Sequence, residues 1–272
     1  MIALGLVFGS LVGFSLGLTG GGGAIFAVPL LVYGLQLPTR EAVGVSLITV
    51  GATAIVGFIQ RLRRRTVEIP TGLLFAVAGM ATAPLGAWLS RQLPEAVLLV
   101  LFGALMLVIA ARMWIKASRQ EPSAACVPLD EDAGPTCRRD PQGELHLTSR
   151  CALLMAAAGL MVGVLTGLFG VGGGFIIVPA LVTFSGMAIE RAVGTSLLVI
   201  SLVSVSGIVG HFVGGDSVPA ALVVWFLAGS LGGMIAGTGV GKRLAGRRLQ
   251  QVFAMLIVAV GVFVIARNLI WD

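Results

Sequence analysis

The stretch Gly17-Leu-Thr-Gly-Gly-Gly-Gly-Ala-Ile-Phe-Ala-Val-Pro29 occurs a second time, loosely, as Gly167-Leu-Phe-Gly-Val-Gly-Gly-Gly-Phe-Ile-Ile-Val-Pro179. Both ends of the motif are displaced by 150 residues (167 − 17 and 179 − 29), so its internal spacing is preserved without a gap. Glycine destabilises a helix by about 1 kcal/mol per residue relative to alanine, and four in a row are expected to break one. Each copy therefore predicts a break that opens an apolar segment.

The composition indicates a membrane protein. Of 272 residues, 57% are hydrophobic and 11% are charged, and the mean hydropathy is +1.03. A soluble domain carries about 25% charged residues. Apolar runs recur along almost the whole chain, and a soluble fold has too little interior to bury them. We therefore predict an all-α polytopic membrane protein embedded in the lipid bilayer.

The chain divides into two similar halves. Ala42-Val-Gly-Val-Ser-Leu47 recurs as Ala192-Val-Gly-Thr-Ser-Leu197, again 150 residues on. Five apolar segments are expected in each half, at about 2–16, 24–35, 42–60, 69–89 and 95–115, then 152–165, 175–185, 192–211, 218–240 and 249–266. The polar stretch between the halves lacks periodicity and has too few apolar residues for a core. The predicted domains are a first repeat (1–115), a disordered linker (116–150) and a second repeat (151–272).

The segments that flank each glycine run are short. At 1.5 Å per residue, segments 2–16 and 24–35 are about 22 Å and 18 Å long. Each is short for a hydrocarbon core of about 30 Å, and together they are too long for one span. They are either two short spans or a re-entrant pair of broken helices.

The basic residues predict the topology. The net charge is +6, and the bases gather in short loops, which favours the positive-inside rule over a nucleic-acid partner. Arg61-Leu-Arg-Arg-Arg65 follows the third segment, whereas Lys242-Arg-Leu-Ala-Gly-Arg-Arg248 follows the ninth. The basic loop thus changes position between the halves, which predicts inverted repeats, a cytoplasmic linker and both termini outside.

The same placement predicts reduced cysteines. Cys126, Cys137 and Cys151 lie in or beside the linker, and their spacing matches no zinc signature. In the cytoplasm all three are expected to remain thiols. We expect no metal and no cofactor.

Backbone amides at the glycine breaks are the candidate anion site. The first amides of a helix are unpaired, its dipole is positive there, and glycine lets a ligand approach closely. The two runs are expected to face each other near the bilayer centre. Hydroxyl groups nearby complete the candidate substrate-binding set: Thr19, Gly20, Gly21, Gly22, Gly23, Ser46, Thr49, Gly170, Gly172, Gly173, Gly174 and Ser196. The alternatives are close helix packing for the glycines and back-bonding to a helix carbonyl for the hydroxyls.

Four further polar residues are weaker candidates for a gate or a proton relay. They are Gln60, Arg91, His211 and Arg267. For Gln60 and His211 a solvated helix end is the preferred interpretation, and the two arginines could attract anions or snorkel. No apolar segment has an Asp or Glu at its centre, which argues against a carboxylate-based pump. No paired carboxylate or Cys-His pair lies in a span, so we do not expect an enzyme.

At these motifs the chain resembles the sulfite exporter TauE/SafE family, also called the toluene sulfonate uptake permease family. The resemblance rests on both glycine runs, on Pro29 and Pro179, and on the repeated Val-Gly-X-Ser-Leu motif at 43–47 and 193–197. It implies a bacterial inner-membrane permease for sulfite, thiosulfate, sulfoacetate or other organosulfonates. Phe169 replaces Thr19 in the second copy, so the two half-sites differ chemically.

Three functions are compatible with the sequence. The first is a secondary anion transporter that works by alternating access, the second an anion channel, and the third a membrane-embedded enzyme or receptor scaffold. The sequence leaves open the transport direction, the coupling to protons or another ion, and whether the chain forms a homodimer.

Overall fold

The computed structural model describes residues 2–119, 149–185, 187–213 and 218–241, together with residues 258, 260–262 and 267. The described part is helical and contains no strand, which confirms the predicted fold class. Its elements are α1 (Ile2–Thr19), η1 (Gly22–Phe26), α2 (Ala27–Pro29), η2 (Leu30–Gly34), α3 (Thr39–Leu62), α4 (Ile69–Gln92), α5 (Glu95–Arg119), α6 (Ser149–Phe169), α7 (Gly174–Ser185), α8 (Ile189–Val213) and α9 (Ala220–Gly241). Most of the predicted linker and of the tenth segment falls outside the described residues.

Among the described residues, five helices are long and apolar enough to cross a membrane. They are Thr39–Leu62, Ile69–Gln92, Cys151–Phe169, Glu190–Val213 and Ala220–Val240. The segments that follow the glycine runs are shorter. Gly22–Gly34 is a shorter apolar helix, and α7 has 12 residues, or about 18 Å. Neither reaches across a hydrocarbon core of about 30 Å, so each contributes a half-length element inside the bundle.

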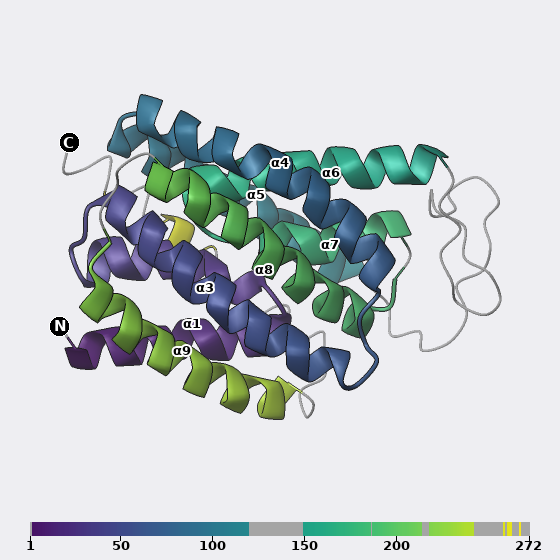
Figure 1. Cartoon of the computed structure of the whole chain (residues 1–272), viewed down its shortest axis with the longest axis horizontal. Coiled ribbons are helices and arrows are strands. Elements are labelled where there is room, and N and C mark those ends of the chain that lie inside the picture. Colours follow the sequence, from purple (N-terminus) through teal and green to yellow (C-terminus); the bar gives the residue numbers. More distant parts are fainter. Residues whose placement is uncertain are drawn as a thin grey trace.

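Six long helices form a continuous row (Figure 1). Their order, given by the helices that contact one another, is α1, α9, α3, α8, α4, α6. Figure 1 shows α1 and α9 along one edge, α4 and α6 along the other, and α3 and α8 between them. The counterpart helices of the two halves are α1 and α6, α3 and α8, and α4 and α9. Exchanging each helix for its counterpart gives the same row, read from its opposite end.

Glycine sets the close packing at both edges of this row. Along α1, a Cβ on Gly9, Gly13 or Gly17 would run into the carbonyl oxygen of Phe226, Ser230 or Met234 in α9. Residue numbers rise together on both helices, so α1 and α9 are parallel. Small-residue contacts of this kind let helix backbones approach closely in a membrane, where no hydrophobic force drives them together.

The other edge is built in the same way. A Cβ on Gly159, Gly163 or Gly167 of α6 would meet the carbonyl oxygen of Phe75, Gly79 or Ala83 in α4. These helices are also parallel. The glycines on these faces of α1 and α6 therefore serve close helix packing.

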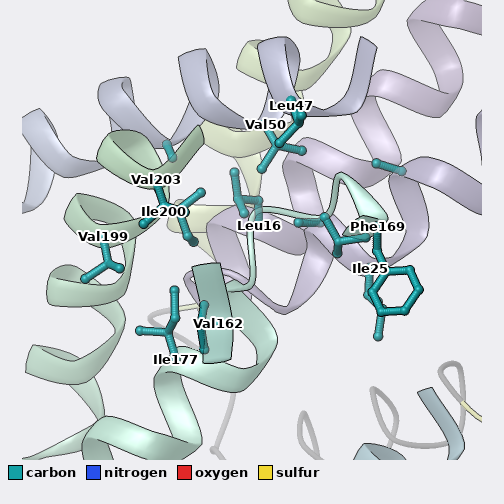
Figure 2. Packing of buried hydrophobic residues seen from close by; sticks show 14 of the residues in the cluster. Leu16, Ile25, Leu47, Val50, Val162, Phe169, Ile177, Val199, Ile200 and Val203 are labelled. Carbon is teal, nitrogen blue, oxygen red and sulfur yellow. The ribbon is translucent and has the colours of Figure 1, made fainter. Parts of the chain in front are cut away.

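The two central helices run in opposite directions. Gly44 of α3 lies against His211 of α8, and Gly51 lies against Ser204, so residue numbers rise on one helix as they fall on the other. The apolar core surrounds this crossing. Figure 2 shows side chains of several elements packed into one buried cluster that includes Leu16, Val50, Val162, Ile177 and Ile200.

One expectation about the cysteines is wrong. Cys151, buried near the start of α6, is disulfide-bonded. The thiol expectation follows only from the predicted compartment. A disulfide depends first on the separation and direction of the two side chains, which spacing in the sequence does not give.

Candidate functional site

Each glycine run begins where a helix ends, and the two helices end in the same way. Gly20 follows α1 with φ +73°, and Gly170 follows α6 with φ +67°. The amide of Gly20 donates to the carbonyl oxygen of Leu16 at 2.8 Å, and that of Gly170 donates to Thr166 at 2.8 Å. A left-handed residue just past the last turn is the usual glycine stop of a helix, because no Cβ opposes it. The predicted breaks are therefore present in both halves.

The two runs differ in how the chain resumes. After the first run, Gly22 opens a 3-10 turn of five residues. After the second, Gly172 (φ +67°) and Gly173 (φ +63°) are both left-handed, and a regular α-helix, α7, begins at Gly174. Only the second run therefore leads directly into an α-helix long enough to present an aligned N-terminus.

The structure brings the two runs into direct contact. A Cβ on Gly21 would lie 2.7 Å from the Cα of Gly174. The runs are also held by the repeated motif of the opposite half, because Gly20 lies against Val193 and Gly170 against Val43. These contacts join residues that are far apart in the sequence, so the runs form a single centre where the halves meet.

Several amides of this centre lack a backbone acceptor. Within the described residues, the amides of Gly21, Gly22 and Gly23, and those of Val171, Gly172 and Gly173, donate to no backbone carbonyl. All six residues are buried. Buried amides without a partner are rare in native structures, because each loses its hydrogen bond to water. A ligand with several acceptor oxygens would satisfy them, and an anion fits best.

The predicted hydroxyls divide into two groups. Thr19 donates to the carbonyl oxygen of Ser15 at 2.8 Å, and Thr49 donates to Val45 at 2.7 Å, which is the back-bonding alternative. Ser196 donates to Gly20 of the first run at 2.6 Å, so it fixes the glycine backbone instead of pointing a free hydroxyl at a ligand. Ser46 is fully buried and has no hydrogen-bond partner.

Three more buried hydroxyls without a partner lie beside the runs. Ser15 is next to Gly23, Thr166 is next to Gly173, and Ser204 is next to Gly172. None of these three residues is in the predicted substrate-binding set. The signal that could have found Ser15 and Thr166 is a hydroxyl one or two turns before a glycine break on an otherwise apolar helix.

The weaker gate and relay candidates lie away from this centre. Gln60 is half-buried near the end of α3, and Arg267 stacks over the ring of Tyr33 at 5.3 Å. His211 is 5% exposed and lies against Gly44, so the preferred interpretation of a solvated helix end is wrong for it. The antiparallel packing of α8 on α3 buries it. Arg91 donates from Nη2 to the carbonyl oxygens of Gly210 and His211 at 2.8 and 3.1 Å, where it caps α8.

The described residues close around the centre in this arrangement. A small apolar pocket beside it is lined by residues that include Val28, Val43, Phe102, Leu168 and Phe169. This pocket offers almost no polar surface to an anion. Among the described residues, no group of three or more His, Cys, Asp or Glu side chains could hold a metal ion.

The fold and the centre together define a polytopic membrane protein in which broken helices meet inside the bundle, an arrangement known from membrane transporters. Consistent with this class, residues 5–264 match the sulfite exporter TauE/SafE family, and the chain belongs to that family. It is a membrane transporter, a class of protein distinct from enzymes.

Relatives carry the same description. A "probable membrane transporter protein" of Xylella fastidiosa (strain 9a5c) is 32% identical over 267 residues, covering 96% of this chain and 93% of its own. The "probable membrane transporter protein YunE" of Bacillus subtilis (strain 168) is 28% identical over 285 residues, covering 100% and 97%. A protein of the same description from Methanocaldococcus jannaschii is 24% identical over 240 residues, covering 82% and 81%. No solved structure gives a significant match.

Proposed function

We propose that this protein is a secondary transporter of small sulfur-containing anions, such as sulfite, thiosulfate, sulfoacetate or other organosulfonates. The observation that carries the proposal is the centre formed by Gly21 and Gly174, where buried amides of both runs lack acceptors. An anion bound there needs no charged side chain, because several amides and a helix N-terminus share its charge. The sulfur chemistry of the anion is supported by the family to which the chain belongs.

Alternating access is supported by the packing of the two halves. The counterpart helices α3 and α8 are antiparallel, and parallel pairs flank them on both sides. This is the arrangement expected of inverted repeats, in which one half can rock against the other around a fixed site. Because Gly21 and Gly174 touch, an anion enters only if the two runs separate.

We further propose an inner-membrane location with the end that carries residues 61–65 in the cytoplasm. Arg63, Arg64 and Arg65 are exposed at that end, as the positive-inside rule requires. The disulfide of Cys151 lies at the same end and favours an oxidising compartment. We base the orientation on the charges, because they act when the protein inserts into the membrane. Two neighbouring cysteines can remain thiols if their compartment is reducing, so the disulfide is the weaker argument.

Flux in vesicles tests the function. The purified chain is reconstituted into liposomes, and uptake of radiolabelled thiosulfate or sulfite is measured with and without the same anion inside. A transporter gives uptake that saturates and that is accelerated by internal anion. Non-saturating flux that follows the membrane potential would establish a channel instead. If neither sulfur anion moves or binds, the substrate class is wrong.

A further inference from the structure

We infer that the anion is held asymmetrically, by the second glycine run with Thr166, Ser204 and Ser46, while the first run closes against it. This inference rests on the proposed function and deepens it. It adds the hydroxyls of Thr166 and Ser204 to that of Ser46 as ligands of the transported oxyanion.

The first step is the position of these hydroxyls. A Cβ on Gly173 would lie 2.7 Å from Thr166 Oγ1, and one on Gly172 would lie 3.7 Å from Ser204 Oγ. Gly172 is also in contact with Val50 of α3, and Gly170 with Val43, so Ser46 lies on the same face of α3 between them. The three hydroxyls therefore come from α6, α8 and α3 and surround one run.

The second step is their hydrogen bonding. Thr166, Ser204 and Ser46 are each 0% exposed, and none of the three hydroxyls has a hydrogen-bond partner. A buried hydroxyl without a partner is unfavourable, because it has lost its hydrogen bonds to water. In a membrane helix it normally donates to the carbonyl three or four residues earlier, as Thr49 does. These three hydroxyls make no such bond, and they surround amides that also donate to no backbone carbonyl. Together they form a set of donors that suits a ligand with several acceptor atoms.

The third step is the difference between the halves. The counterpart of Thr166 is Leu16 and that of Ser204 is Ala54, so the first half lacks both hydroxyls. Ser196, the counterpart of Ser46, is already bonded to Gly20. Among the described residues, the unpartnered hydroxyl beside the first run is that of Ser15, and this run leads into a 3-10 turn instead of an α-helix. The second run therefore combines several unpartnered hydroxyl donors with the positive end of an α-helix, and the first run does not.

The donor set selects the chemistry of the ligand. Hydroxyl and amide protons with the positive end of α7 favour a small oxyanion with three or more acceptor oxygens. No Lys or Arg is among the described groups placed around this run, so a monoanion or a compact dianion would be bound by hydrogen bonds alone. Sulfite and thiosulfate both have this character.

The test compares variants of the purified full chain by thermal shift and by flux. We expect Thr166→Val and Ser204→Ala each to raise the KM for thiosulfate about tenfold, the value of one hydrogen bond to a charged group. They should also reduce the rise in melting temperature that sodium thiosulfate causes relative to sodium chloride at equal ionic strength. The melting temperature without anion should stay unchanged or rise, because removing an unpartnered hydroxyl relieves a cost. Thr166→Ser should restore the KM.

A matched control is Thr82→Val. Thr82 donates to the carbonyl oxygen of Leu160 at 2.7 Å between α4 and α6, so its loss should lower the melting temperature and leave the KM unchanged. If the wild type responds to thiosulfate or sulfite but Thr166→Val and Ser204→Ala respond equally, the asymmetric site is wrong while the proposed function stands. The inference is also overturned if the two variants change only the dependence on sodium, which would mark a cation site. If the wild type responds to neither anion, the proposed function itself fails.

Discussion

Gly21 and Gly174 meet backbone to backbone where the two halves of the chain touch. A Cβ on Gly21 would lie 2.7 Å from the Cα of Gly174, and a Cβ on Gly174 would lie 2.6 Å from the Cα of Gly21. Neither neighbour is a flexible side chain, so the clash can be relieved only by moving the runs apart. The contact therefore couples the position of one half to that of the other.

Gly21→Ala is expected to reduce thiosulfate flux at least about tenfold and to lower stability by about 1–3 kcal/mol, the usual cost of overpacking. The control is Gly232→Ala in α9, where a Cβ would have nothing within 4 Å. That change should leave flux intact and be neutral or slightly stabilising, because alanine favours the helix. Flux in liposomes and thermal unfolding in detergent measure both. Normal flux in Gly21→Ala would show that the contact has no part in transport.

The packing of α4 on α6 gives a second prediction. A Cβ on Gly163 would run into the carbonyl oxygen of Gly79 and the hydroxyl of Thr82. Gly163→Val should therefore separate the two helices and lower the melting temperature strongly. Gly239→Val, at a position with open space, should cost only the weaker helix propensity of valine. Equal stability of the two variants would contradict the glycine packing described for this edge.

Arg91 is predicted to stabilise the end of α8. Its Nη2 donates to the carbonyl oxygens of Gly210 and His211, and hydrogen bonds from a charged group contribute about 1.5–3 kcal/mol. Arg91→Gln should lower the melting temperature, and Arg91→Lys should lower it less. A role only as a gate predicts the opposite pattern, with changed flux at unchanged stability. Measuring both quantities on the same preparations separates the two roles.

The pair Glu68 and Arg191 is predicted to contribute little. Its closest atoms are 3.7 Å apart, and the arginine side chain is 49% exposed, so the attraction is screened by water and salt. Arg191→Gln should cost less than about 1 kcal/mol. Thr195→Val should cost more, because its buried Oγ1 accepts the amide of Glu68 at 3.0 Å. A larger loss for Arg191→Gln, measured by thermal unfolding at several salt concentrations, would contradict this ranking.

Labelling of single cysteines tests the proposed orientation. In a variant without native cysteines, Arg64→Cys should react with a membrane-impermeant maleimide only after the cells are permeabilised. Gln92→Cys, at the other end of α4, should react in intact cells. The reverse pattern would place the basic loop outside and would agree with the disulfide of Cys151.

The sequence alone determined the fold class and the position of the helix breaks. Hydropathy decides the first, because apolar runs of this length can be satisfied only by helices in a membrane. Glycine decides the second, because Gly20 and Gly170 adopt φ values that other residues avoid. The family resemblance rests on the same glycine residues, and for that reason it is visible in the sequence itself.

Only the tertiary structure decided which polar groups remain available to a ligand. Thr19, Thr49 and Ser196 look like Ser46 in the sequence, yet their hydroxyls are bonded to carbonyl groups whereas that of Ser46 is not. Thr166 lies one turn before a glycine break, but the sequence does not show that its hydroxyl lacks a partner. Whether a hydroxyl is free depends on its rotamer and on backbone from the other half of the chain, and spacing along one chain carries neither.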